Sequence, residues 1–214
     1  MNGLPNTPVV AVVLAAGMSR RMGAQNKLLL AIEGQPMVRH VVLAALASRC
    51  QKVLVVVGHE AGYVRQVLSD LAVEFVFNEA FAEGIGASVR AGAQAVSSQQ
   101  AVLYCLADMP GVSAGVIDQL VDAFHAYPDF MGFVPAFNGK RGNPVLWAPG
   151  CVLQLRKAAG DEGARRLLHQ YRDRVMAVTV ASEGVMVDLH TPDDYWHVYN
   201  RRTSNPAHRL SRLS

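Results

Sequence analysis

The sequence is poor in charged residues, has few cysteines and contains no long uninterrupted apolar run. Charged side chains make up 17% of its 214 residues, whereas hydrophobic ones make up 51%. This balance excludes a disordered scaffold and favours a globular protein with a large core. No stretch approaches the ~20 consecutive apolar residues that a membrane span needs. Residues 1–8 also lack the basic segment followed by an apolar segment that marks a secretory signal. We therefore expect a cytoplasmic protein with no membrane partner.

The three cysteines, Cys50, Cys105 and Cys151, are widely spaced and form neither a C-x-x-C pair nor a zinc pattern with histidine. We expect free thiols in a reducing compartment. The formal net charge is only +3, and much of the positive excess lies in residues 201–214. Such a basic end could contact an acidic partner, but a solvated and frayed tail is the simpler expectation. Because no basic stripe is interleaved with aromatic residues, we do not expect nucleic-acid binding.

Short apolar runs alternate with helix-like segments along most of the chain. The early runs are continuous Val/Leu stretches, as in parallel strands that are buried on both faces. Their alternation with helices predicts one three-layer α/β domain over residues 1–200, with a Rossmann-like, mostly parallel sheet. The turn-rich segment 138–143 predicts either a hairpin-like excursion or an antiparallel strand within that sheet. The expected strands are residues 9–14, 53–57, 73–77, 101–107, 131–136, 143–147 and 175–180, and the expected helices are residues 37–47, 61–71, 87–96, 113–127 and 162–171.

The first apolar run ends in a glycine-bearing loop that reads L-A-A-G-M-S-R-R-M-G and is followed by Lys27. A strand that enters such a loop presents backbone N–H groups to phosphate. Small residues at the strand exit let a nucleobase or a phosphate approach the backbone. Arg21 and Lys27 can then supply positive charge to a triphosphate. The spacing matches neither the Walker loop nor the dinucleotide-binding fingerprint. The alternative is an ordinary turn with solvated cations.

Two acidic residues stand out because of what surrounds them. Asp108 follows the apolar run 101–107, and Pro110 prevents the strand from continuing. Ligands of open α/β sheets bind at the carboxyl ends of the strands, so Asp108 is well placed to hold Mg²⁺ beside a triphosphate. A turn or helix-capping aspartate is the alternative. Thr191-Pro192 followed by acids predicts a helix start, but this start does not explain Asp188, which precedes it.

These segments resemble the signatures of the MobA-like nucleotidyltransferases over roughly residues 8–200. The resemblance rests on the L-A-A-G-x-S-x-R-M-G loop with Lys27, on L-A-D-M-P at residues 106–110, and on Asp188 before Thr191-Pro192. This family moves a nucleoside monophosphate from an NTP onto a phosphorylated acceptor, and the chain looks most like its molybdenum cofactor cytidylyltransferases. The resemblance implies that Lys27, Arg21 and Asp108 are catalytic, and that Asp108 and Asp188 hold Mg²⁺.

The chain departs from the family pattern in two places. Three residues, Ala24-Gln25-Asn26, separate the last loop glycine from Lys27, where many relatives have two. His190 stands where Asp or Asn is common.

The resemblance also implies two sets of binding residues. An N-x₅-G-x-x-x-S stretch, in which we expect Ser88 to begin a helix, lines the nucleotide pocket in the family; here the alternative is an ordinary loop and helix cap. Segments similar to G-x-R-G-N-P and G-D-x-G-A-R lie on the acceptor side, where arginine can clamp a phosphate through two hydrogen bonds. The implied nucleotide-binding residues are Leu14, Ala15, Ala16, Gly17, Ser19, Lys27, Asn78, Gly84, Ser88 and Asp108, and the implied acceptor-binding residues are Arg141, Asn143 and Arg165.

The reaction implied by this resemblance transfers CMP from CTP to the phosphate of a molybdopterin cofactor and releases pyrophosphate. Ala15-Ala16 favours CTP, because guanine-using relatives tend to have L-A-G-G at the strand exit. An apo-molybdoenzyme would be the recipient of the product. The alternatives are a guanylyltransferase or a sugar- or polyol-phosphate nucleotidyltransferase of the same fold, and a non-catalytic molybdopterin-binding chaperone.

Overall fold

The protein is described from a computed structural model, which describes residues 7–18, 26–160, 165–189 and 194. Within these residues an eight-stranded sheet forms the centre of the molecule, in the order β10-β7-β9-β6-β1-β4-β5, with β8 paired to β7 at its side. Its strands are β1 (Val9–Ala15), β4 (Lys52–Val57), β5 (Glu74–Phe77), β6 (Ala101–Leu106), β7 (Gly132–Phe137), β8 (Lys140–Arg141), β9 (Val145–Trp147) and β10 (Val175–Thr179).

The sheet is mostly parallel, as predicted. Strands β6, β1, β4 and β5 run parallel to one another, and so do β7 and β10. Both features that the turn-rich segment 138–143 left open are present. Strand β9 lies antiparallel between β6 and β7, and β8 forms a hairpin with β7. Asn138 and Gly139, at the tip of this hairpin, have φ values of 48° and 76°, the left-handed backbone that a two-residue hairpin turn needs.

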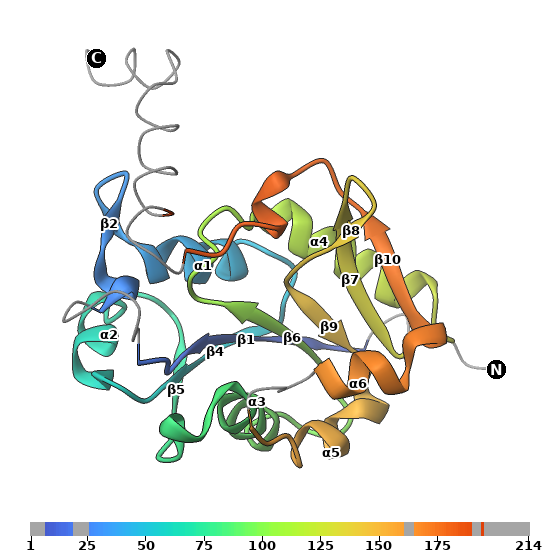
Figure 1. Ribbon diagram of the computed structural model, residues 1–214, viewed down its shortest axis with the longest axis horizontal. Helices are drawn as coiled ribbons and strands as arrows, with labels where there is room; N and C mark the ends of the chain where they lie inside the picture. Colours follow the sequence, from blue (N-terminus) through green and yellow to red (C-terminus); the bar gives the residue numbers. More distant parts are fainter. Residues whose placement is uncertain (1–6, 19–25, 161–164, 190–193, 195–214) are drawn as a thin grey trace, which may run out of the picture.

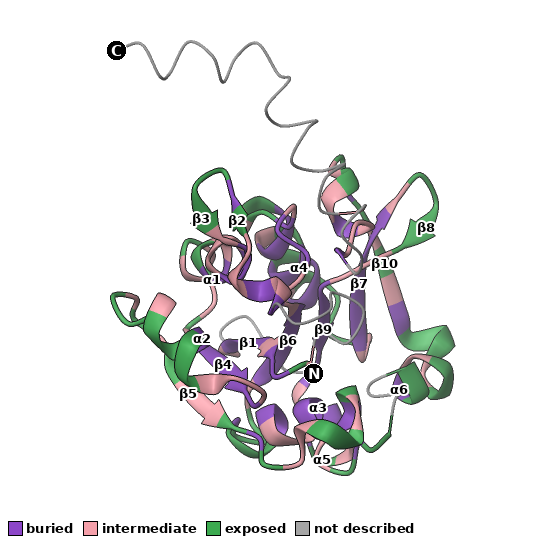
Figure 2. Ribbon diagram, turned by 60° about the vertical axis from the view of Figure 1, so that its left-hand side comes forward, coloured by how far each residue is buried: buried purple, intermediate pink, exposed green. Residues whose placement is uncertain are grey.

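Helices cover both faces of the sheet and make three layers (Figure 1). Along β1 the side chains alternate: Val9, Ala11 and Val13 pack into one apolar cluster, and Val10 and Val12 into the other. Both sets are buried, as the continuous apolar runs predicted, and Figure 2 shows the central strands as the most buried part of the fold. The first cluster is closed by α1 (Met37–Leu46), α2 (Ala61–Val67) and α4 (Ala114–Ala126), and the second by α3 (Ile85–Gln94), α5 (Val152–Leu155) and α6 (Arg165–Gln170).

Short elements complete the described chain. A small hairpin of β2 (Ala31–Ile32) and β3 (Gln35–Pro36) precedes α1. The 3-10 turns are η2 (Lys27–Leu29), η3 (Phe81–Glu83), η4 (Pro149–Cys151), η5 (Arg172–Arg174) and η6 (Glu183–Val185). No helix of the described residues has the length and apolar character needed to cross a membrane. Cys50, Cys105 and Cys151 are free thiols, as predicted.

The expected start of one helix is wrong. Helix α3 begins at Ile85, three residues before Ser88, because Gly84 takes a φ of 105° and ends the preceding turn there. Ser88 therefore lies inside the helix. Gly86, in the first turn of α3, donates its N–H to the carbonyl of Gly160 at 2.8 Å. A Cβ at Gly86 would lie 2.5 Å from the backbone of Ala159, so glycine is needed for this close approach.

Candidate active site

The central feature of the site is an ion pair between Lys27 and Asp108. Lys27 Nζ lies 2.5 Å from Asp108 Oδ2, and each side chain is only 13% exposed. Asp108 follows β6, and Lys27 begins η2 after the loop that leaves β1. These two strands are neighbours in the sheet and parallel, so their carboxyl ends meet at one edge. The structure thus brings together two residues that the sequence predicted separately.

Lys27 is held in place by a capped turn. Asn26 is the N-cap of η2, and its side chain accepts a hydrogen bond from the N–H of Leu28 at 3.1 Å. The Leu28 side chain is buried in the core, with 4% exposure. Asn26 is the last of the three residues that separate the loop glycine from Lys27, where many relatives have two. The longer spacer therefore contains the residue that fixes the lysine backbone.

The Asp188 segment runs directly beside Asp108. The N–H of Leu189 donates to the Asp108 carbonyl at 3.0 Å. Leu189 and Val187 pack with Ile32 and Met37 in a separate apolar cluster. Asp188 stands between Val187 and Leu189 and is half-buried. Two carboxylates on adjoining segments are the hard oxygen ligands that suit Mg²⁺, which fills its other positions with water and phosphate oxygens.

Among the described residues, no group of three His, Cys, Asp or Glu side chains could hold a metal by itself.

Residues 15–17, at the end of β1 and just after it, offer little more than backbone. Ala15 and Ala16 are buried, at 1% and 2% exposure. A Cβ at Gly17 would have no heavy atom within 4 Å, so the space beside this residue is open. The Leu14 carbonyl accepts from the N–H of Ala107 at 3.3 Å, which ties the ends of β1 and β6 together. Ser19, Arg21 and His190, like the tail 201–214, lie outside the described residues.

Asn78 and Ser88, which the family resemblance places in the nucleotide pocket, bond to each other. Asn78 Nδ2 donates to Ser88 Oγ at 3.1 Å, and Asn78 Oδ1 accepts from the N–H of Ala80 at 3.1 Å. Both residues are buried, at 4% and 6% exposure. Their bond joins the loop after β5 to α3. Gly84 lies between the two residues in the sequence.

The acceptor-side residues come from the opposite half of the sheet. In the β7–β8 pairing Phe137 faces Lys140, and Ala136 faces Arg141. Directly opposed residues share a face of the sheet, so Lys140 and Arg141 point to opposite faces. Val134, two residues before Ala136, packs in the cluster that α6 covers. Arg141 is therefore on the face that carries Arg165.

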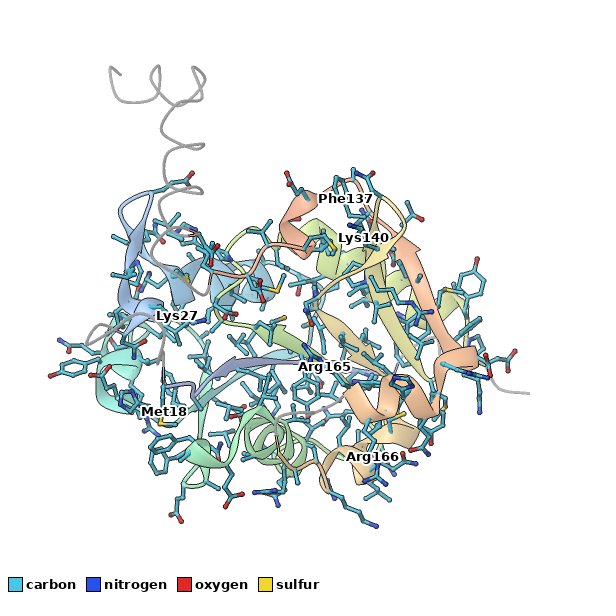
Figure 3. The ribbon with its side chains drawn as sticks, in the orientation of Figure 1. Met18, Lys27, Phe137, Lys140, Arg165 and Arg166 are labelled. Atoms are coloured by element: carbon cyan, nitrogen blue, oxygen red, sulfur yellow. The ribbon has the colours of Figure 1, made fainter. Side chains whose placement is uncertain are left out.

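Figure 3 shows how these basic residues are distributed. Lys27 lies in η2, Lys140 lies beside Phe137 on the β7–β8 hairpin, and Arg165 lies at the beginning of α6. Arg141 and Arg165 are both exposed. Asn143 is fixed by its backbone, because its N–H donates to the Val185 carbonyl at 2.9 Å.

Two hollows in the described part of the chain are lined by other residues. One, of about 270 Å³, includes Asn26 but not Asp108; it lies among Asn26, Leu29, Leu30, Glu60 and Tyr63. The other, of about 290 Å³, lies between α5 and α6 and includes Arg166 rather than Arg165. Neither is lined by Lys27 or Asp108.

One residue at this edge, His59, was missed by the sequence analysis. It follows β4, and its backbone N–H donates to the Ala16 carbonyl at 3.4 Å. Its ring packs edge-on against Phe81, with 6.0 Å between ring centroids. Within the described residues its buried Nδ1 has no hydrogen-bond partner. The rule that ligands bind at strand carboxyl ends was the signal that could have found it.

Comparison with known proteins places this chain in one class, the nucleotide-using α/β transferases. The model of the MobA-like NTP transferase domain matches residues 11–175, and the chain belongs to this family. The purine catabolism protein PucB of Bacillus subtilis is 33% identical over 87% of this chain and 94% of its own length. The nicotine blue oxidoreductase of Paenarthrobacter nicotinovorans is 27% identical over 89% and 96%.

Solved structures agree on the fold. Rv0371c of Mycobacterium tuberculosis, in a structure with manganese, superposes with a TM-score of 0.74 at 23% identity, covering 91% of this chain and 99% of that one. Molybdopterin-guanine dinucleotide biosynthesis protein A of Archaeoglobus fulgidus gives a TM-score of 0.65 at 16% identity, covering 92% and 100%. The protein is therefore a nucleotidyltransferase of the MobA-like family.

Proposed function

We propose that this protein transfers CMP from CTP to the phosphate of a molybdopterin cofactor and releases pyrophosphate. The observation that carries the proposal is the Lys27–Asp108 pair at the joined ends of β1 and β6, with the Asp188 segment bonded to it. A lysine and two carboxylates at one sheet edge suit a triphosphate and a divalent cation. They have no evident use in a protein that only carries a pterin.

The chemistry requires positioning and charge neutralisation more than covalent help. An oxygen of the acceptor phosphate attacks the α-phosphorus of CTP, and the bond from that phosphorus to the pyrophosphate oxygen breaks. Backbone N–H groups of the loop after β1 would hold the phosphates. Lys27, with Arg21, would stabilise the negative charge that builds on the transferred and leaving groups.

Mg²⁺ is the proposed cofactor, and Asp108 and Asp188 are its proposed ligands. When bound, it would neutralise phosphate charge and so favour attack by an anionic acceptor. The manganese in a solved structure of the same fold, that of Rv0371c, supports the choice of a divalent cation.

Arg141 and Arg165 are proposed to clamp the acceptor phosphate, with Asn143 beside them. Their support is that the β7–β8 register puts Arg141 on the sheet face that α6, which begins at Arg165, covers. CTP is proposed over GTP on Ala15-Ala16 at the strand exit. We propose the cytoplasm as the place of action, and an apo-molybdoenzyme as the recipient of the product.

The proposal is tested by measuring pyrophosphate release with molybdopterin cofactor, Mg²⁺ and each of CTP, GTP, ATP and UTP in turn. We expect release with CTP and much slower release with the other three. Fastest release with GTP would make the protein a guanylyltransferase. Release only with a sugar or polyol phosphate as acceptor would make the protein a sugar- or polyol-phosphate nucleotidyltransferase. Absence of release with any nucleotide and any of these acceptors would overturn the enzyme assignment and leave the chaperone.

A further inference from the structure

Under the proposed function, Lys27 and a divalent cation would compete for the same carboxylate, that of Asp108. The Lys27 ammonium lies 2.5 Å from Asp108 Oδ2, and both side chains are 87% covered. The ammonium therefore contacts an oxygen that, in the proposed function, is a ligand of Mg²⁺. A cation that binds Asp108 must either displace Lys27 or sit beside its positive charge in a poorly hydrated place, where repulsion between like charges is strong.

We propose that Lys27 excludes a divalent cation from Asp108 until a nucleotide triphosphate draws the lysine away, so that metal and nucleotide bind interdependently. This inference rests on the proposed function for the identity of the nucleotide. A triphosphate offers the ammonium several anionic oxygens in exchange for one carboxylate. Once Lys27 has moved to them, Asp108 is available to the cation, and the positive charge that opposed the cation is neutralised.

The local structure allows this exchange without movement of the backbone. The Asn26 cap and the buried Leu28 side chain hold the main chain of Lys27. The lysine side chain is a flexible four-carbon stem with a terminal charge, so its ammonium can swing between partners from a fixed Cα. The main chain of Asp108 is held too, because its carbonyl accepts from the N–H of Leu189. The lysine head group is the part that the exchange moves.

The exchange has a thermodynamic consequence. If the triphosphate raises the affinity for the cation, the cation must raise the affinity for the triphosphate by the same factor. A cation without nucleotide would bind weakly, which keeps the site from being occupied by metal when no substrate is present.

The test measures Mn²⁺ binding to the nucleotide-free protein by electron paramagnetic resonance and by calorimetry. Lys27→Met removes the ammonium and keeps much of the stem. Lys52→Met is the matched control, since Lys52 is also paired with a carboxylate, that of Glu74 at 3.1 Å, and its loss changes the net charge equally. We expect Lys27→Met to bind Mn²⁺ about 10-fold more tightly than wild type or more, a factor typical of coupled sites. We expect Lys52→Met to bind as wild type does.

Asp108→Asn locates the metal, and we expect it to abolish the tight binding when added to Lys27→Met. An equal affinity in Lys27→Met and Lys52→Met, or tight binding that survives Asp108→Asn, would overturn the inference. Lys27→Gln carries the same test if Lys27→Met does not fold. If Lys27→Met binds Mn²⁺ no more tightly but the wild type releases pyrophosphate, the proposed function stands and the exclusion of metal by Lys27 is wrong. If Lys27→Met binds Mn²⁺ more tightly but the wild type releases no pyrophosphate, the exclusion of metal stands and the proposed function is wrong.

Discussion

The N–H of Leu189 donates a 3.0 Å hydrogen bond to the carbonyl of Asp108. This bond joins the end of the described segment 165–189 to the loop after β6. It carries Asp188, the residue before Leu189, to the vicinity of Asp108. The bond brings together two acids that are far apart in sequence, as the proposed cation site requires, and the path of the chain before Asp188 therefore matters to that proposal.

Both acids should be needed for turnover. We expect Asp108→Asn and Asp188→Asn each to lower the rate of pyrophosphate release by about 10²-fold or more, the scale of a lost electrostatic stabiliser. Asp173→Asn is the matched control, because its side chain is 87% exposed and lies outside the site. A rate near that of wild type in Asp188→Asn would remove this residue from the metal site.

Gly184 should be essential for the path of the Asp188 segment. A Cβ at Gly184 would overlap the carbonyl of Gly111, and one at Gly111 would lie 2.8 Å from the Cα of Gly184. We expect Gly184→Ala to lower the free energy of unfolding by about 1–3 kcal/mol, as overpacking usually does, and to slow catalysis. Gly62→Ala is the control, since Gly62 lies in α2 with no heavy atom near its Cβ position. Urea unfolding measures both, and equal stability of the two variants would refute the contact.

The Asn78–Ser88 bond predicts a structural role for both residues. Ser88→Ala leaves the Asn78 amide without this partner in a buried place. We expect a loss of about 1–3 kcal/mol in the free energy of unfolding, the cost of an unsatisfied buried donor. Ser69→Ala, which removes an exposed hydroxyl bonded to Gln66, should cost much less. A raised KM for CTP in Ser88→Ala with unchanged stability would instead show that this serine contacts the nucleotide.

The buried thiols predict a loss of stability at alkaline pH. Burial raises the pKa of Cys151 to about 11, and it also raises the pKa of Cys50 and of Cys105 above their ordinary value. An unfolded thiol loses its proton near pH 9. The stabilisation is therefore complete below pH 9 and declines as the pH rises from 9 towards 11, because the unfolded state is deprotonated first.

Urea unfolding between pH 8 and 10.5 should show this decline. Cys151→Ala should show a shallower one, since it removes one of the contributing thiols. Identical slopes for the variant and wild type would contradict the assignment.

The sequence predicted most of the sheet because its strands are continuous apolar runs, and burial on both faces requires such runs. It missed elements too short to have a pattern. The β2–β3 hairpin has two-residue strands, and only the turn at Glu33 and Gly34, with φ values of 53° and 80°, could have indicated it. The predicted start of α3 was wrong because serine is a common N-cap, whereas the N-cap of α3 is Gly84.

The sequence singled out individual residues of the proposed site but not their arrangement. Sequence patterns singled out Lys27 and Asp108, yet only the structure shows that they bond to each other. The face on which Arg141 lies follows from the β7–β8 register, which one residue of slippage would reverse. His59 was passed over because single histidines have no spacing to read.

The transfer of a labelled α-phosphate tests the central claim most directly. The protein is incubated with Mg²⁺, molybdopterin cofactor and CTP labelled at the α-phosphorus, and the pterin products are separated. Our account predicts that the label appears in a cytosine dinucleotide of the pterin, in equal amount to the unlabelled pyrophosphate released, and that Asp108→Asn abolishes it. Label that stays in CTP, or that appears only as free CMP, would contradict it.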